Sequence, residues 1–231
     1  MGQVQEGSDP FAQERARMVK QQIERRGLKD PAILEAMRTV PRHLFVPEQY
    51  QRLAYEDMPL PIPAGQTISQ PFIVAYMISL LDPQPTDRVL EIGAGSGYAA
   101  AVLSRVVAEV YTVERHEELV AYARERLTAL GYDNIHIRHG DGTLGWPEHA
   151  PYDGIVVTAC GPRVPPTLKE QLALGGRLVM PVIQDRYYQT LVRVTRVGEK
   201  AYQHEELEPV AFVPLVGEEG WPEEEAYRRY Y

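Results

Sequence analysis

The segment Arg88-Val-Leu-Glu-Ile-Gly-Ala-Gly-Ser-Gly-Tyr98 constrains the fold of this 231-residue chain more than any other stretch. Its first half is mostly apolar and predicts a short buried strand, whereas residues 98–107 are rich in Ala, Leu and Val and predict a helix. Between them, Gly93, Gly95 and Gly97 allow a turn that a ligand can approach closely. A strand, a glycine turn and a helix N-terminus in this order predict a binding site for a nucleotide-like ligand.

Two classes of cofactor use such a turn. The dinucleotide fingerprint requires glycine at its first, third and sixth positions, but the sixth position counted from Gly93 is Tyr98. A looser variant fits when the count starts at Gly95, although the turn then falls two residues into the helix. The pattern Glu91-x-Gly93-x-Gly95-x-Gly97 after a strand is typical of S-adenosylmethionine-dependent methyltransferases, whose cofactor has no pyrophosphate. A nicotinamide cofactor and a glycine turn without a ligand remain alternatives at this point.

Two acidic residues follow at the ends of later strands. Residues 109–114 predict a second strand that ends on Glu114, 21 positions after Gly93, where a carboxylate can accept hydrogen bonds from both ribose hydroxyls. Residues 135–139 predict a third strand, and Gly140-Asp141-Gly142 places an acid where it can contact the adenine amino group. The alternatives are a surface glutamate for Glu114 and a simple Asp-Gly turn for Asp141.

The remaining pattern predicts an α/β fold with a doubly wound, mostly parallel, Rossmann-like sheet, an antiparallel edge and an N-terminal helical extension. Helices are expected at 11–26, 32–39, 72–81, 117–130 and 165–172, and further strands at 152–158, 176–182, 187–197 and 206–213. Asp9-Pro10 and Asp30-Pro31 are typical helix starts. The proline-rich residues 55–65 are not expected to form regular structure. We expect the first sixty residues to pack against the sheet beside the substrate mouth.

The length suits a single domain spanning residues 1–231. Within it we expect a disordered start at 1–10, a substrate-side helical extension at 11–82, a cofactor-binding core at 83–215 and an acidic tail at 216–231.

The composition limits the classes of molecule that this chain is expected to bind. The net charge is −8 and no long run of Lys or Arg occurs, which disfavours a nucleic-acid substrate. Val164-Pro-Pro-Thr167 also lacks the polar and aromatic residues of the adenine-amino methyltransferase tetrapeptide. The only cysteine, Cys160, permits no internal disulfide, and its position near a strand end makes it a candidate for oxidation. Without a signal sequence, a membrane-length apolar run or a metal-ligand spacing, we expect a cytoplasmic protein with no membrane partner and no metal.

Ser69 has two interpretations. It stands in Gln66-Thr-Ile-Ser-Gln-Pro71, directly before the helix predicted at 72–81, and Pro71 suits the first helical position. Spacing alone therefore favours Ser69 or Gln70 as the N-cap of that helix.

From Met18 to about Trp221 the chain resembles the protein-L-isoaspartate O-methyltransferase family. The motifs that carry the resemblance are Val40-Pro-Arg-His-Leu-Phe-Val-Pro47, Gly65-Gln-Thr-Ile-Ser-Gln-Pro71, residues 89–98, Leu130-Gly-Tyr132, Gly140-Asp-Gly142, Gly145-Trp-Pro-Glu148, Gly175-Gly-Arg-Leu178 and Phe212-Val-Pro-Leu215. The resemblance implies methylation of the free carboxylate of L-isoaspartyl residues in damaged proteins and peptides, followed by collapse of the ester to a succinimide. It implies S-adenosyl-L-methionine as cofactor and S-adenosyl-L-homocysteine as product.

The family's functional serine corresponds to Ser69, which the resemblance makes the catalytic residue, and a capping role can coexist with this function. The substrate-binding residues are then Gln66, Thr67 and Ser69, and the cofactor-binding residues are Thr67, Ile68, Gln70, Glu91, Gly93, Gly95, Gly97, Glu114, Asp141 and Gly142. We expect a monomer. A small-molecule methyltransferase, a nucleic-acid methyltransferase and a cofactor-binding module without catalysis remain the competing interpretations.

Overall fold

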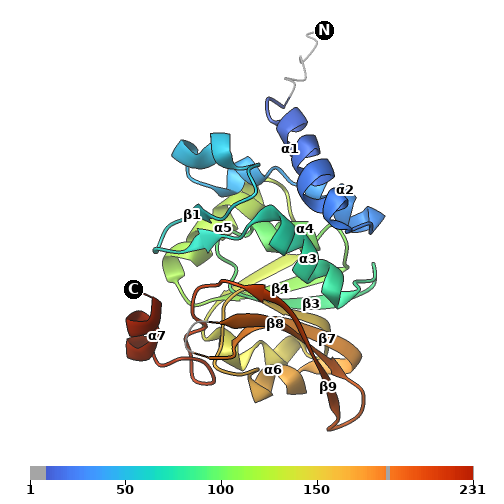
Figure 1. Cartoon of the computed structure of the whole chain (residues 1–231), viewed down its shortest axis with the longest axis vertical. Helices are drawn as coiled ribbons and strands as arrows, with labels where there is room; N and C mark the ends of the chain where they lie inside the picture. Colours follow the sequence, from blue (N-terminus) through green and yellow to red (C-terminus); the bar gives the residue numbers. More distant parts are fainter. Residues whose placement is uncertain (1–8, 186–187, 231) are drawn as a thin grey trace.

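The computed structural model describes residues 9–185 and 188–230, and within them a seven-stranded sheet carries helices on both faces (Figure 1). The strand order is β5-β4-β3-β6-β7-β8-β9. The strands from β5 to β7 run parallel, whereas β8 and β9 are antiparallel additions at one edge. The bounds are β3 (Arg88–Ile92), β4 (Glu109–Glu114), β5 (Ile135–His139), β6 (Tyr152–Val157), β7 (Leu172–Ile183), β8 (Gln189–Arg196) and β9 (Tyr202–Val210). The predicted fold class is confirmed.

The other regular elements surround this sheet. The helices are α1 (Ala12–Met18), α2 (Pro31–Thr39), α3 (Pro71–Leu81), α4 (Tyr98–Leu103), α5 (Glu117–Ala129), α6 (Pro166–Glu170) and α7 (Glu223–Tyr230). A π-helical turn spans Val19–Ile23, and 3-10 turns span Glu24–Arg26, Arg42–Phe45, Glu48–Leu53, Gly142–Leu144 and Pro147–His149. A small antiparallel pair joins β1 (Leu60–Pro61) to β2 (Thr67–Ile68).

The central strands β3, β4 and β6 are buried on both faces, which explains their nearly continuous apolar sequences. Along β3, Val89 belongs to the core beneath α3, α4 and α5, whereas Leu90 and Ile92 belong to the core on the side of α6. This alternation is the two-residue period of a strand. The carboxyl ends of β3, β4 and β6 consequently meet at one edge, where the glycine turn emerges.

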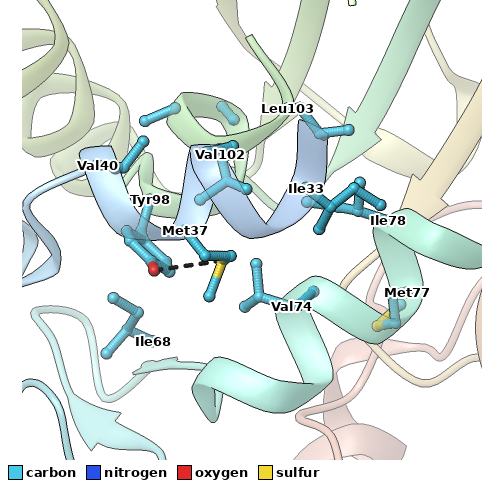
Figure 2. Packing of buried hydrophobic residues seen from close by; sticks show 14 of the residues in the cluster. Ile33, Met37, Val40, Ile68, Val74, Met77, Ile78, Tyr98, Val102 and Leu103 are labelled. Atoms are coloured by element: carbon cyan, nitrogen blue, oxygen red, sulfur yellow. Dashed lines mark hydrogen bonds between the residues drawn. The ribbon is translucent and has the colours of Figure 1, made fainter. Parts of the chain in front are cut away.

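The N-terminal extension packs mainly on helices. Asp30 caps α2, because its Oδ1 accepts hydrogen bonds from the N–H groups of the second and third residues of the helix. Figure 2 shows Ile33 and Met37 of α2 packed against α3 and α4, with the Tyr98 hydroxyl directed at the Met37 sulfur, 3.6 Å away. The expectation that this region packs directly on the sheet was wrong, since α3 and α4 lie between.

Several predicted boundaries were also wrong. The helix expected at 98–107 ends at Leu103, because the Val106 N–H bonds to the Leu103 carbonyl three residues back and tightens the chain. The helix expected at 11–26 consists of α1, the π-helical turn and a 3-10 turn, and Gly27 ends it in the left-handed region. The last strand spans 202–210 rather than 206–213. In the proline-rich segment, Leu60–Pro61 does form a short strand.

The ends of the chain differ from expectation as well. Residues 1–8 of the start predicted to be disordered lie outside the described residues, but Asp9 is anchored by an ion pair of 2.6 Å with Arg15. The acidic tail contains a helix, α7, that the sequence pattern did not indicate. Across residues 9–185 and 188–230, none of the helices combines the length and the apolar character that crossing a membrane requires.

Candidate active site

A cavity of about 390 Å³ lies at the carboxyl ends of β3, β4 and β6. Its walls come from the 64–69 segment, α3, the glycine turn, the start of α5 and the chain after β9. The volume falls in the range of small-molecule sites, roughly 300–1,000 Å³. Of the predicted site residues, the cavity wall contains Gln66, Thr67, Ile68, Ser69, Gly93, Gly95, Glu114 and Gly142.

The glycine turn needs glycine for two different reasons. At Gly93, φ is +94° and a Cβ would lie 2.5 Å from the Thr158 Oγ1, which donates a hydrogen bond to the Gly93 carbonyl at 2.8 Å. A side chain at Gly93 would displace the Thr158 hydroxyl and break this hydrogen bond between the ends of β3 and β6. At Gly97, a Cβ would meet Ala123 and Leu127 of α5, at 3.2 and 3.3 Å. Gly97 therefore serves the packing of α4 on α5, and the structure does not place it on the cavity wall.

Glu114 is held firmly at the end of β4. Only 5% of its surface is exposed, its Oε2 accepts a hydrogen bond from the Gly95 N–H at 3.0 Å, and its Oε1 accepts one from the His116 N–H at 2.9 Å. Each carboxylate oxygen can accept a second hydrogen bond. The carboxylate is therefore fixed on the cavity wall with capacity left for two hydroxyl donors.

Glu91 lies behind the wall rather than in it. The Thr112 hydroxyl donates a hydrogen bond to its Oε2 at 2.6 Å, and its Oε1 has no partner among the described residues. Burial raises the pKa of Glu91 to about 8, the Thr112 hydrogen bond opposes this and the Glu114 charge adds to it. At neutral pH the group is therefore mostly the uncharged acid, as expected for a carboxyl taken out of water. This buried position does not match the direct contact with the cofactor that the sequence analysis predicts for Glu91.

Asp141 is directed at the C-terminal segment of the chain. Its Oδ1 accepts hydrogen bonds from the Thr143 N–H and hydroxyl, at 2.8 and 2.7 Å, and its Oδ2 accepts one from the Glu218 N–H at 2.7 Å. The structure does not place it on the cavity wall, whereas Gly142 does line the cavity. A Cβ on Gly142 would lie 2.4 Å from the Ile92 side chain, so this position has no room for one.

The 66–70 segment brings Ser69 to the cavity without using it as a cap. β1 and β2 form a hairpin whose second strand anchors Ile68 in the core, and Ser69 follows on the cavity wall. Gln70 occupies the N-cap position of α3, as one of the two predicted alternatives has it, but no side chain caps the helix, so the capping role predicted for Ser69 was wrong. Gln70 is instead directed away from the cavity, where its Nε2 donates to the Asp57 carbonyl at 3.3 Å. Among the described residues, the Ser69 hydroxyl has no hydrogen-bond partner.

The segment after β9 was not singled out as part of the site. The Cys160 N–H donates to the Val213 carbonyl and the Leu215 N–H donates to the Cys160 carbonyl, both at 2.8 Å. This pairing, an isolated parallel bridge between Cys160 and Pro214 beyond the carboxyl end of β6, brings residues 213–216 onto the cavity wall. The motif at 212–215 was visible in the sequence, but no titratable group marked it. Cys160 itself is fully buried, which argues against the oxidation expected for it.

The cavity suits the cofactor that the sequence predicts. The closely packed glycines leave main chain exposed at its floor, an anchored carboxylate lies at its side, and apolar residues such as Ile68, Met77 and Val156 form the remaining wall. A sulfonium nucleoside needs both the hydroxyl acceptors and the apolar enclosure. The residues present therefore fit S-adenosylmethionine.

Comparisons with known proteins agree with this geometry. Residues 13–220 match the family described as protein-L-isoaspartate(D-aspartate) O-methyltransferase. The chain is 62% identical over 204 residues to protein-L-isoaspartate O-methyltransferase 2 of Pelobacter propionicus, covering 88% of this chain and 91% of that protein. It is 59% identical over 211 residues to the corresponding enzyme 1 of Geotalea uraniireducens, covering 91% and 96%.

Solved structures give the same result. One protein-L-isoaspartate O-methyltransferase structure is 30% identical with a TM-score of 0.79, covering 90% of this chain and 67% of that one. A putative protein-L-isoaspartate O-methyltransferase from Plasmodium falciparum, solved in complex with S-adenosyl-L-homocysteine, is 27% identical with a TM-score of 0.75, covering 87% and 98%. Family match, identity and fold agree, and the chain belongs to the protein-L-isoaspartate(D-aspartate) O-methyltransferase family.

Proposed function

We propose that this protein transfers the methyl group of S-adenosylmethionine to the free carboxylate of L-isoaspartyl residues in proteins and peptides. One observation carries the proposal: the unpartnered hydroxyl of Ser69 shares a cavity with the glycine turn and with the anchored carboxylate of Glu114. A cofactor contact and an acceptor contact are thus available within one enclosure. The relative from Plasmodium falciparum, which is bound to S-adenosyl-L-homocysteine, supports the cofactor assignment.

The acceptor explains why the cavity needs no strong base. A peptide carboxylate has an ordinary pKa of about 4 and is already ionised at neutral pH. When bound, S-adenosylmethionine supplies an electrophilic methyl group on a sulfonium. The task of the chain is then to orient the acceptor oxygen and to exclude water, since charge is neutralised as the methyl moves.

We assign roles to the residues on this basis. Glu114 accepts hydrogen bonds from the ribose hydroxyls, and the turn at Gly93 and Gly95 presents main chain to the cofactor. Ser69 donates a hydrogen bond to the acceptor carboxylate, and Gln66 and Thr67 border the peptide path. Glu91, Gly97, Gln70 and Asp141 support this wall from outside the cavity.

We further propose that the protein acts as a cytoplasmic monomer on peptide rather than nucleic-acid substrates. The net charge of −8 supports the substrate class, and the single cysteine is compatible with a reducing compartment. Light scattering coupled to size-exclusion chromatography measures the mass in solution and so tests whether the protein is a monomer. The mass of a dimer would contradict this proposal.

Transfer of tritiated methyl groups tests the main proposal. The protein is incubated with labelled S-adenosylmethionine and either an isoaspartyl peptide or the same peptide with normal aspartate. We expect base-labile radioactivity in the isoaspartyl peptide alone, as the ester releases methanol. Equal labelling of both peptides, or labelling of RNA or a small metabolite instead, would overturn the proposal.

A further inference from the structure

The C-terminal helix α7 begins at Glu223, beyond residue 220, where the match to the family ends. Glu223 and Ala226 nevertheless line the cavity, and Ala226 is only 2% exposed. Residues three apart lie on the same side of a helix. One side of α7 therefore forms part of the cavity wall, although this helix lies outside the family match.

The contacts of α7 show which end of the cavity it closes. The Arg115 guanidinium forms an ion pair with the Glu223 carboxylate, Nη2 to Oε1, at 3.0 Å. Arg115 directly follows Glu114 at the end of β4, and both residues line the cavity. If Glu114 binds the ribose, as proposed above, α7 covers the nucleoside end of the site rather than the acceptor end at Ser69.

A clamped turn ahead of α7 holds the helix in this position. The N–H groups of Glu218 and Glu219 donate hydrogen bonds to Asp141 Oδ2 and Thr143 Oγ1, at 2.7 and 3.1 Å. The turn fits so closely that a Cβ on Gly217 would lie 2.1 Å from Asp141 Oδ1. Asp141, which the sequence suggests for adenine, thus anchors the segment that leads into α7.

Two further contacts complete the clamp. The Glu219 carboxylate accepts hydrogen bonds from the Thr167 N–H and hydroxyl, at 3.0 and 2.8 Å. The buried Trp221 indole N–H donates to the Cys160 carbonyl at 2.9 Å. Because the turn is fixed on both sides within a few residues of Glu223, the start of α7 has little freedom to leave the cavity.

We propose that α7 is a wall of the cofactor site, formed by residues beyond the family match, with Ala226 as the close contact at the nucleoside end and the Glu223–Arg115 pair holding the helix against β4. The inference rests on the proposed function, because it takes the cavity as the S-adenosylmethionine site. We expect this wall to slow the release of cofactor and product, because α7 helps to enclose the nucleoside end of the cavity.

Binding of S-adenosylhomocysteine tests the proposal without recourse to catalysis. Titration calorimetry gives Kd, and release of labelled ligand into an excess of unlabelled ligand gives the dissociation rate. We expect Ala226→Leu to raise Kd about tenfold or more, mostly through faster dissociation, because the larger side chain enters the space of the nucleoside while leucine remains a good helix former. We expect Glu223→Gln to raise Kd roughly two- to fivefold at low salt, as for an exposed ion pair.

Glu224→Gln is the matched control, because it removes the same charge from an exposed residue of α7 that does not line the cavity, and it should keep the wild-type Kd. A chain ending after Trp221, checked for folding by circular dichroism, serves as a second test if Ala226→Leu unfolds. Wild-type Kd and release rate in the shortened chain would overturn the inference. Failure of the wild type itself to bind the ligand would instead contradict the proposed function.

Discussion

Ser69 has a half-buried hydroxyl on the cavity wall, and no described residue satisfies it. If it donates to the acceptor carboxylate, Ser69→Ala should lower kcat roughly 10- to 100-fold, because a hydrogen bond to a charged group contributes ~1.5–3 kcal/mol. The affinity for S-adenosylhomocysteine should stay nearly unchanged. Steady-state kinetics and calorimetry measure the two effects, and Ser79→Ala in α3, whose hydroxyl bonds to the Tyr76 carbonyl, is the control. Equal losses in both quantities would contradict the assigned role.

Glu114 should act mainly on the cofactor. Glu114→Gln places an amide where two N–H donors and the ribose hydroxyls require acceptors, so the Kd of S-adenosylhomocysteine should rise at least about tenfold, or ~1.4 kcal/mol. Glu118→Gln removes the same charge from an exposed position of α5 and should not change the Kd. An unchanged calorimetric Kd in Glu114→Gln would exclude ribose binding by this residue.

Glu91 makes stability depend on pH in an unusual direction. Burial raises its pKa from 4.5 to about 8, so the folded protein retains a proton that the unfolded chain has already lost over that interval. The free energy of unfolding should therefore decrease as the pH rises from about 4.5 to 8. The contribution of Glu91 to the free energy of unfolding is fully present below pH 4.5 and is lost above a pH of about 8.

Glu91→Gln removes this dependence, because an amide does not titrate. Urea unfolding without cofactor at pH 6 and pH 8 should show a smaller decrease for the variant than for the wild type, and the variant should be the more stable protein at pH 8. Glu118→Gln, at an exposed position, should retain the wild-type dependence. Parallel wild-type and Glu91→Gln profiles would show that Glu91 is charged in the folded state.

At the scale of the element, α2 depends on its cap. Asp30 Oδ1 accepts two main-chain N–H hydrogen bonds, so Asp30→Ala should lower the free energy of unfolding by about 1 kcal/mol, within the ~0.5–2 kcal/mol measured for such caps. Asp30→Asn keeps the acceptor and should lose much less. Urea unfolding of the three proteins measures the difference, and equal losses in both variants would refute a capping role.

The bounds of a helix or strand could be predicted where residues close in sequence determine them. The cap at Asp30, the end of α5 near Gly131 and the strands β3, β4 and β5 follow from short-range rules. At one boundary that failed, a distant contact accompanies the local hydrogen bonds. For α4, the Ser104 carbonyl accepts a hydrogen bond from the Asn134 side chain, 30 residues away, at the point where the helix stops.

At the scale of the whole molecule, we propose that residues 11–82 and 83–215 unfold together as one domain. Their side chains share one core, in which Met37 and Ile78 pack with Tyr98 and Val102, and both parts line the cavity (Figure 2). Calorimetry should show a single transition, and S-adenosylhomocysteine at 100 times its Kd should stabilise it by about 2.7 kcal/mol, or about 5–10 °C in Tm. Two resolved transitions, only one of them shifted by ligand, would contradict a single domain.

The sequence by itself determined the parallel sheet, the position of the glycine turn and the arrival of Glu114 beside it. These follow because apolar periodicity defines the strands, and the carboxyl ends of parallel strands necessarily meet at one edge. The segment around Ser69 was identified from its motif rather than from any physical pattern.

Only the tertiary structure decided how the acids near the cavity are used. Asp141 bonds to Glu218, 77 positions away, and Arg115 pairs with Glu223, 108 positions away. Complete burial in the folded chain raises the pKa of Glu91 and favours its uncharged form. Contacts over such separations and the loss of solvent they produce are properties of the packed chain, and no local pattern of residues encodes them.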